Sequence, residues 1–297
     1  MMQGAFDWAA LAEYCVIGLL SGGLLSLIAL GFVLIYKGTG VINFAMGEFM
    51  MLGAYFFYTA KVLWGLPLPL ALVLSFIAVA ACAAVIERTI LRPLSGQPVI
   101  SILMATIGLG SALHGGVDAI WGGRNYEMPA LLPRTPLVIG EVLIPGQMMW
   151  SFLLATIVIA AFTLYFQYSK TGMSMRAAAS DPMTAYVMGI DVQATQRLTW
   201  IFSGLVGAIA GVIVASTTSL SPAVGSAALG VLAIIILGGL DSIAGAIVAA
   251  LIVGLIQSLT AGYLGGKVRD LVPYVTVLLI LLVRPYGLFG TRQIERL

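Results

Sequence analysis

Long apolar stretches separated by short polar connections dominate the chain. We interpret nine of them as helical segments, at residues 14–35, 48–60, 68–86, 98–121, 146–168, 198–218, 225–238, 243–261 and 271–283. A helix needs about 20 mainly apolar residues to cross a bilayer, and two of the segments, 48–60 and 225–238, are short for a full crossing. Each of these two adjoins a glycine-rich break, Gly38-Thr39-Gly40 or Gly238-Gly239-Leu240-Asp241. Such interrupted segments are typical of discontinuous helices around a transport path, although a helix that tilts or ends early gives the same pattern.

The composition supports a membrane protein and excludes most soluble classes. Of the 297 residues, 61% are hydrophobic and 9% are charged, whereas a soluble domain carries roughly 25% charged residues. The net charge of +2 is too balanced to indicate a nucleic-acid partner. We therefore predict an all-α polytopic membrane protein. It would have eight to nine transmembrane or re-entrant segments in a single domain over residues 1–297.

The distribution of Lys and Arg predicts the orientation. If all nine segments cross, one face carries nine basic residues and the other carries five. The larger set is Lys37, Arg88, Arg92, Lys170, Arg176, Arg197, Arg284, Arg292 and Arg296, and the smaller is Lys61, Arg124, Arg134, Lys267 and Arg269. Because inner loops are richer in Lys and Arg, we expect the N-terminus outside and the C-terminus inside. Eight crossings and one re-entrant segment would fit the hydropathy nearly as well, and would move one terminus across.

Two connections are long enough to have structure of their own. The outer one, 122–146, is expected to contain a small hairpin that turns at Gly140-Glu141. In the inner one, 170–197, Ser180 or Asp181 can cap a helix that starts at Pro182 and stops at Gly189. Residues 172–179, just before it, are expected to form another short helical piece.

The predicted helix after Pro182 has one apolar stripe. It consists of Met183, Tyr186, Val187 and Ile190, at the spacing of one helix face. Such a helix can lie against lipid headgroups, but its own charges are Asp181 and Asp191 rather than the Lys and Arg that anionic lipid favours. We therefore favour an amphipathic cytoplasmic helix that docks into a groove of a partner protein.

Several groups of residues between about Gly18 and Gly290 form a recognisable series. They are Leu27–Tyr36, Gly40–Glu48, Glu87-Arg88 with Arg92-Pro93, Gly172 with Arg176-Ala177 and Gly189-Ile190, Leu237-Gly238-Gly239 with Ser242 and Gly245-Ala246, and Arg284-Pro285 with Gly287–Gly290. In order and spacing this series resembles the permease family of branched-chain amino acid ABC transporters. One departure is Met46, where many members of that family have His; any role that depends on an imidazole is absent here.

The resemblance implies an importer in the bacterial inner membrane. Its parts would be an extracytoplasmic solute-binding protein, two permease subunits, expected to be this chain and a different one, and two ATPases on the inner face. It also implies that loop 170–197 couples to the ATPases, through Arg176 together with Met183, Tyr186, Val187 and Ile190. The solute would be a branched-chain or similar small amino acid, with urea, short amides and other small solutes as alternatives.

The chain is not expected to be an enzyme. It has no Gly-x-x-x-x-Gly-Lys-Ser/Thr loop for nucleotide phosphates, so ATP hydrolysis would belong to the partner subunits. No catalytic residue, cofactor or metal cluster is predicted, and His114 is the only histidine.

Four residues at the two breaks are candidates for the translocation path or for stabilising a broken helix: Asn43, Met46, Glu48 and Asp241. Charged groups in a bilayer are costly and often functional. For Asn43, Glu48 and Asp241 we favour the structural role, in which side chains satisfy exposed backbone groups at the break, and for Met46 a packing or gating role.

A stand-alone proton-coupled transporter is the alternative class. In it, Glu48, His114, Asp118 and Asp241 would carry the coupling protons. His114 and Asp118 are spaced i, i+4, and a plain interfacial pair is the simpler interpretation of that spacing.

Overall fold

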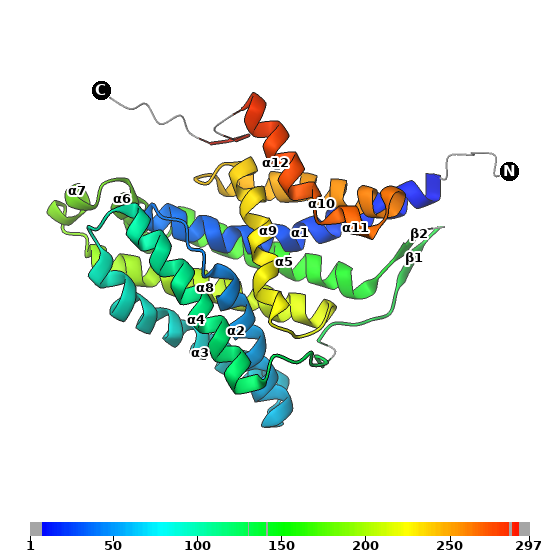
Figure 1. The fold of residues 1–297 in the computed structure, drawn as a ribbon, viewed down its shortest axis with the longest axis horizontal. Helices are drawn as coiled ribbons and strands as arrows, with labels where there is room; N and C mark the ends of the chain where they lie inside the picture. The colour runs from blue at the N-terminus through cyan, green and yellow to red at the C-terminus, as the bar shows by residue number, and fades with distance from the viewer. Residues whose placement is uncertain (1–7, 130, 141, 285–286, 291–297) are drawn as a thin grey trace.

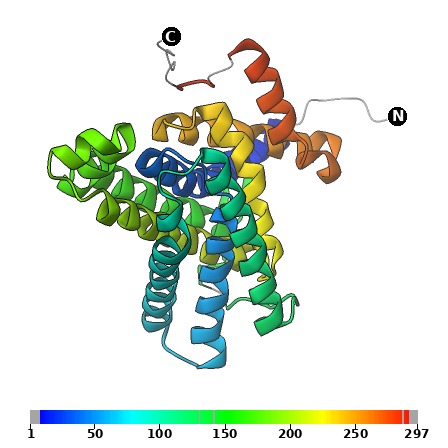
Figure 2. The ribbon, with the colours of Figure 1, turned by 60° about the vertical axis from the view of Figure 1, so that its left-hand side comes forward.

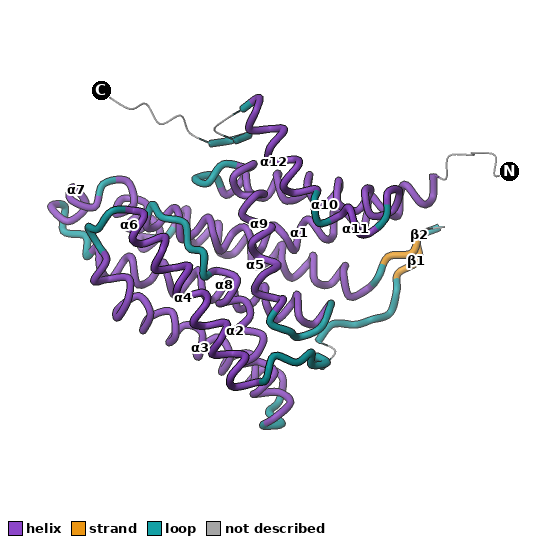
Figure 3. Tube along the Cα trace, viewed as in Figure 1, coloured by secondary structure: helices purple, strands orange, loops and turns teal. Residues whose placement is uncertain are grey.

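The structure, a computed structural model, describes residues 8–129, 131–140, 142–284 and 287–290. It is almost entirely helical (Figures 1 and 3). The long helices are α1 (Trp8–Thr39), α3 (Leu68–Ile86), α4 (Val99–Trp121), α5 (Gly146–Tyr168), α8 (Val192–Thr217) and α10 (Ile243–Leu264). The shorter helices are α2 (Met46–Tyr58), α6 (Lys170–Ser180), α7 (Pro182–Val187), α9 (Ala223–Gly238), α11 (Gly266–Arg269) and α12 (Val272–Val283). Two π-helical turns, Thr59–Leu63 and Glu87–Leu91, extend α2 and α3, and a 3-10 turn, Arg92–Leu94, follows the second.

The predicted all-α membrane fold is confirmed. Each of the nine apolar segments is a helix, with bounds close to those expected. Within the described residues, six helices are long and apolar enough to cross a membrane, and α9 and α12 are shorter apolar helices. With 13 residues, α2 spans about 20 Å at 1.5 Å per residue, less than the roughly 30 Å hydrocarbon core. How many segments cross fully therefore stays a prediction.

Helices α1 and α10 pack against each other in antiparallel orientation along most of their length (Figure 1). At one end Tyr14 meets Tyr263 edge to face, with ring centroids 5.5 Å apart. At the other end the Lys37 ammonium donates to the carbonyl of Asp241, 2.6 Å away. A Cβ on Gly18 would lie 2.8 Å from the Cα of Leu255, so glycine is needed for this close approach of the two backbones.

Helix α2 begins inside the molecule rather than at a surface. Its first turn packs against α1, α8 and α9, and Met46, Phe49 and Met50 are fully buried. Figures 1 and 2 show α2, α3 and α4 together on one side of the molecule, in blue to teal, with α9, in yellow, beside α2. The interior start of α2 matches the pattern of a discontinuous helix.

The connecting elements lie at opposite ends of the molecule. Helices α6 and α7 are at the left of Figure 1, which we call the α7 end; strands β1 (Leu137–Ile139) and β2 (Val142–Ile144) are at the right, the hairpin end. The predicted hairpin is present, with Leu137 paired to Ile144 and Gly140 at φ +64°. The second turn residue, Glu141, and the expected basic or motif residues Pro285, Arg292 and Arg296 lie outside the described part of the chain.

Candidate functional site

The first break joins α1 to α2 through a buried polar contact. Helix α1 ends where the Gly40 amide donates to the Tyr36 carbonyl, and Gly40 has φ +72°, a backbone conformation that favours glycine. The buried Asn43 accepts a hydrogen bond from the Ala45 amide, 2.9 Å away. Its Nδ2 has no hydrogen-bond partner among the described residues. Asn43 thus satisfies one backbone group at the break, which a buried site requires.

Met46, the second candidate, lies in the packed interior. Its side chain fills the space left by two glycines on neighbouring helices, because a Cβ on Gly207 would lie 2.9 Å from the Met46 methyl and one on Gly31 would overlap it. The Ser203 hydroxyl donates to the Gly31 carbonyl at 2.7 Å and lies 3.3 Å from the Met46 sulfur. Met46 therefore joins α1, α2 and α8 by packing, and its side chain reaches no surface of this chain.

Glu48 does not cap α2 as expected. Its carboxylate is directed across to α4, where Oε2 lies 3.4 Å from His114 Nδ1. The other ring nitrogen of His114 is 4.0 Å from Asp118 Oδ2, as the i, i+4 spacing suggested. The Glu48 side chain is 15% exposed, against 38% for His114 and 46% for Asp118. These three groups, which we call the polar line, therefore run from the buried start of α2 to the open face of α4.

The second break, between α9 and α10, brings distant segments together. Ser242 caps α10 by accepting from the Gly245 amide, and the Asp241 carbonyl accepts from Lys37. The segment 287–290 covers the end of α9: Leu288 and Phe289 donate their amides to the carbonyls of Leu237 and Gly238, at 2.8 and 3.1 Å. The carbonyls that a helix C-terminus leaves unpaired are thus satisfied by a remote piece of chain.

Loop 170–197 contains the expected capped helix. The Asp181 side chain accepts from the amides of Met183 and Thr184 at 3.0 and 3.1 Å, and Gly189 (φ +82°) ends the helix. Hydrogen bonds from the Thr184 hydroxyl and amide hold the pKa of the Asp181 carboxyl below its ordinary range. Residues 172–179, the other helical piece predicted, lie within α6.

The apolar face of α7 is open to solvent. Met183, Tyr186 and Val187 are 74%, 70% and 78% exposed. Ile190, the fourth residue of the predicted stripe, is half-buried. Met188, at 77% exposure, lies beyond the last residue of α7 and was not in the predicted stripe. The exposed group is therefore Met183, Tyr186, Val187 and Met188, which we call the α7 knob.

Arg176 lies behind the α7 knob and ties α6 to α5. Its guanidinium donates to the carbonyls of Phe166 and Gln167, and its Cζ lies 5.5 Å from the centroid of the Phe166 ring. A cation at a helix C-terminus satisfies unpaired carbonyls and interacts well with the helix dipole. Arg176 therefore fixes the base from which the α7 knob projects.

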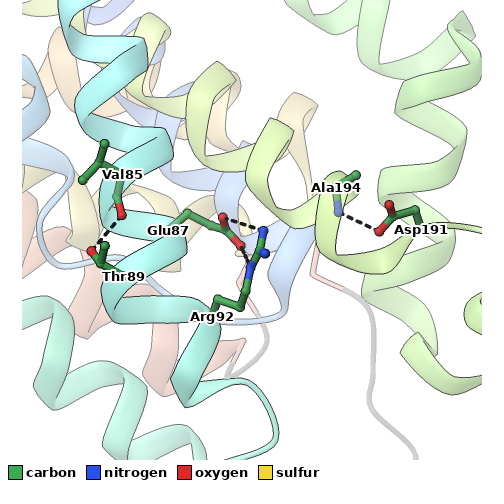
Figure 4. Close-up of polar contacts among 6 residues, drawn as sticks. All are labelled: Val85, Glu87, Thr89, Arg92, Asp191 and Ala194. Atoms are coloured by element: carbon green, nitrogen blue, oxygen red, sulfur yellow. Dashed lines mark hydrogen bonds and ion pairs between the residues drawn. The ribbon is translucent and has the colours of Figure 1, made fainter.

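A partly buried ion pair lies at the C-terminal end of α3 (Figure 4). The Glu87 side chain is 3% exposed, and both its oxygens are 3.4 Å from the Arg92 guanidinium. Figure 4 also shows the Asp191 side chain accepting from the Ala194 amide at the start of α8. The motif residues Glu87 and Arg92 thus form one bidentate contact next to a capped helix. Across the described residues, no three His, Cys, Asp or Glu side chains gather closely enough to hold a metal ion.

Sequence patterns missed the contacts between distant helices. The i, i+4 spacing found His114 with Asp118, but nothing in the sequence predicted that Glu48 contacts His114 or that Lys37 contacts the Asp241 carbonyl. The basic residue in the last turn of α1, facing a break that exposes carbonyls, was the available signal for the second contact.

Discontinuous helices that meet inside a multi-pass bundle are the arrangement of membrane transporters, and that is the class that the fold and the site define. The chain belongs to the family described as branched-chain amino acid transport system, permease component, whose model matches residues 14–282.

Curated relatives agree with this family. The chain is 28% identical to the high-affinity branched-chain amino acid transport system permease protein LivH of Escherichia coli K12, over 94% of this chain and 95% of LivH. It is 30% identical to the corresponding protein BraD of Pseudomonas aeruginosa PAO1, over 96% and 97%. A more distant relative is the guanosine ABC transporter permease protein NupQ of Bacillus subtilis 168, at 28% identity over 75% and 74%.

Proposed function

We propose that this chain is a membrane-spanning permease subunit of an ATP-binding cassette importer, which carries branched-chain or similar small amino acids across the bacterial inner membrane. A second permease subunit, expected to be a different chain, would complete the path. Two ATPases would supply the energy and an extracytoplasmic binding protein would deliver the solute. Family membership and the names of LivH and BraD support the solute class.

The α7 knob is the observation that carries the ATPase partnership. Four neighbouring large apolar side chains, all at least 70% exposed, are unusual on a protein surface unless something covers them. The helix beneath them is capped by Asp181 and held through Arg176. A short, fixed helix with an apolar tip fits a groove in a partner, and a self-contained transporter has no need of one.

The charged residues support an orientation with the α7 end in the cytosol. Lys37 and Arg176 belong to elements at the α7 end, and Lys267 and Arg269 of α11 lie at the other. Lys37 and Arg176 belong to the larger predicted set of basic residues, and Lys267 and Arg269 belong to the smaller. Because the positive-inside rule places the more basic face in the cytosol, the α7 end would be cytosolic. The N-terminus would then be outside and the C-terminus inside.

For the translocation path, we propose the open face of α4 beside the polar line. Glu48 there would offer a carboxylate to an ammonium group, and the other surroundings are apolar and would tolerate an aliphatic side chain. Asn43, Met46 and Asp241 would act by holding the broken helices in place. Few polar groups in the path imply weak solute affinity in the permease itself, so specificity would lie largely in the binding protein.

The test of the ATPase partnership is the substitution Tyr186→Asp, with Tyr186→Phe as the matched control. A carboxylate buried without a partner in an apolar groove costs several kcal/mol, so we expect Tyr186→Asp to abolish solute-stimulated ATP hydrolysis and uptake in the reconstituted importer. Membrane insertion should be unchanged, because the side chain is 70% exposed in this chain. Tyr186→Phe should keep both activities. Normal uptake by Tyr186→Asp would contradict the proposal.

Two observations each support a different alternative function. The similarity to NupQ, named a guanosine permease, supports the same class of importer with another solute, which binding measurements on the associated binding protein would decide. The contact between Glu48 and His114 supports proton coupling. Proteoliposomes that contain this chain alone distinguish a stand-alone proton-coupled transporter from an importer subunit. Uptake driven by a pH gradient without ATP would favour the stand-alone transporter.

A further inference from the structure

An apolar groove of about 270 Å³ lies between α3 and α5, near the hairpin end, and nothing in the site above uses it. Its floor is α8, where Ile209 and Ile213 line it, and Leu131 and Leu132 of the loop after α4 cover one end. An apolar cavity of roughly 150 Å³ can stay dry and take up a small organic molecule. The groove is larger, so it has room for a longer apolar molecule.

The lining leaves no polar group in need of a ligand. Ser216 is the one polar side chain in it, and its hydroxyl already donates to the Ile213 carbonyl at 2.7 Å. The Ser216 carbonyl accepts from the side-chain amide of Gln147. Because water needs two to four polar partners, the groove suits neither water nor a zwitterionic solute. It suits a hydrocarbon chain.

The groove runs inward along α3 and opens toward the bilayer. Leu68, Leu72 and Phe76 line it at four-residue spacing, so it follows α3 for about 12 Å at 1.5 Å per residue. The neighbouring residues Ile77 and Ile157 are 59% and 57% exposed, as expected of a lipid-facing surface. A hydrocarbon chain can therefore enter from the side.

Positive charge lies near the Leu68 end of the groove. The Lys61 ammonium donates to the Leu66 carbonyl, 3.2 Å away and two residues before Leu68. The exposed Arg134 follows the lining residue Leu132 by two positions. Both cations belong to segments that adjoin lining residues of the groove, and positive charge there complements a lipid phosphate.

We propose that the groove binds one phospholipid, whose acyl chain lies between α3 and α5 on α8 and whose phosphate is held by Lys61 and Arg134. The lipid fills a space that these helices leave between them and so joins α3 to α5. The proposal is independent of the solute and of the ATPase partners.

The test is the number of phospholipids retained by the full chain in mild detergent, counted by native mass spectrometry after incubation with phosphatidylglycerol or phosphatidylcholine. We expect one retained phospholipid, which Val158→Trp displaces by filling the groove. Ile157→Trp, one residue along on the exposed face of α5, should leave it bound. Where the Trp perturbs folding, Ile209→Phe on the floor is a smaller filling change with the same expected result.

A second set of variants tests the contact with the lipid phosphate. Arg134→Gln and Lys61→Gln should each weaken phosphatidylglycerol retention about fivefold, at roughly 1 kcal/mol per cation near a membrane surface, whereas Arg269→Gln in α11 should not. Equal lipid counts in Val158→Trp and Ile157→Trp would overturn the proposal. So would a Val158→Trp chain that loses a protein partner while keeping its lipid, because the groove would then seat a second subunit.

Discussion

The two glycine-rich breaks both leave backbone groups of helix ends to be paired, but they lie in different surroundings. Before α2 the end of the break that leads into the helix is buried, and the side chain of Asn43, 1% exposed, satisfies the Ala45 amide there. Before α10 the residues that lead into the helix, 240–242, are half-buried, and distant groups contact the break: Lys37 from α1 and the 287–290 segment. Both breaks present unpaired groups of helix ends.

The difference teaches what burial demands. In the interior, water cannot replace a lost partner, so packing and hydrogen bonding must be satisfied together by residues close in sequence. Around the half-buried Ser242 water is available, and the contacts of the second break add rigidity between segments far apart in the chain. Substitutions at the first break should therefore cost more than equivalent ones at the second.

The largest expected effect is at Gly47, in the first turn of α2. A Cβ there would overlap the carbonyl oxygen of Gly225, and backbone cannot move aside as a flexible side chain does. We expect Gly47→Val to cost at least about 3 kcal/mol of unfolding free energy. Unfolding by SDS titration of mixed micelles, followed by tryptophan fluorescence, measures it. Gly108→Val in α4 is the control, since nothing lies within 4 Å of a Cβ at Gly108, and equal losses in both variants would contradict the packing argument.

Helix caps offer a direct comparison of the two breaks. Asn43→Ala leaves the buried Ala45 amide without its acceptor, at about 2 kcal/mol. Ser242→Ala removes the α10 cap, at about 1 kcal/mol. Both are read in the same unfolding titration. A larger loss from Ser242→Ala would show that burial is not what separates the two breaks.

The smallest effect is expected at the fully exposed helix start of α7, and it depends on pH. The pKa of Asp181 lies below its ordinary value because Thr184 donates to the carboxylate, so the folded state favours the ionised form. Its contribution is therefore complete above the ordinary pKa, near 3.8, and is lost as the pH falls through the lowered value.

Hydrogen exchange of the α7 amides, corrected for the intrinsic pH dependence of exchange, measures this change. Protection should fall in acid in the wild type, while Asp181→Asn should show a flat profile across the same range. An identical profile in both would exclude the carboxylate as the cause.

Local patterns were sufficient to predict the helices, including the short capped helix of loop 170–197. The apolar runs predicted the bounds of the segments, and Asp181, Pro182 and Gly189 predicted α7, because caps and stops depend on neighbours in sequence. The family was identified from ordered motifs, and the comparisons confirm it.

Contacts between helices could not be predicted in this way. Glu48 was expected to serve its own helix start, but a contact with His114 depends on how α2 and α4 meet. Ile190 fits the apolar stripe by spacing, yet it is half-buried because the chain turns at Gly189 before reaching it. Residue spacing describes one helix at a time, and the placement of helices against one another decides such cases.

The glycine contacts around α2 limit how the subunit can change shape. The first two turns of α2 have backbone against backbone, Gly47 at the Gly225 carbonyl and Gly211 at the Met50 carbonyl, with no compressible side chain between them. Sliding or rolling of α2 against α8 or α9 would force backbone atoms together. We therefore expect these three helices to move together during a transport cycle, with any opening at the borders of the group they form.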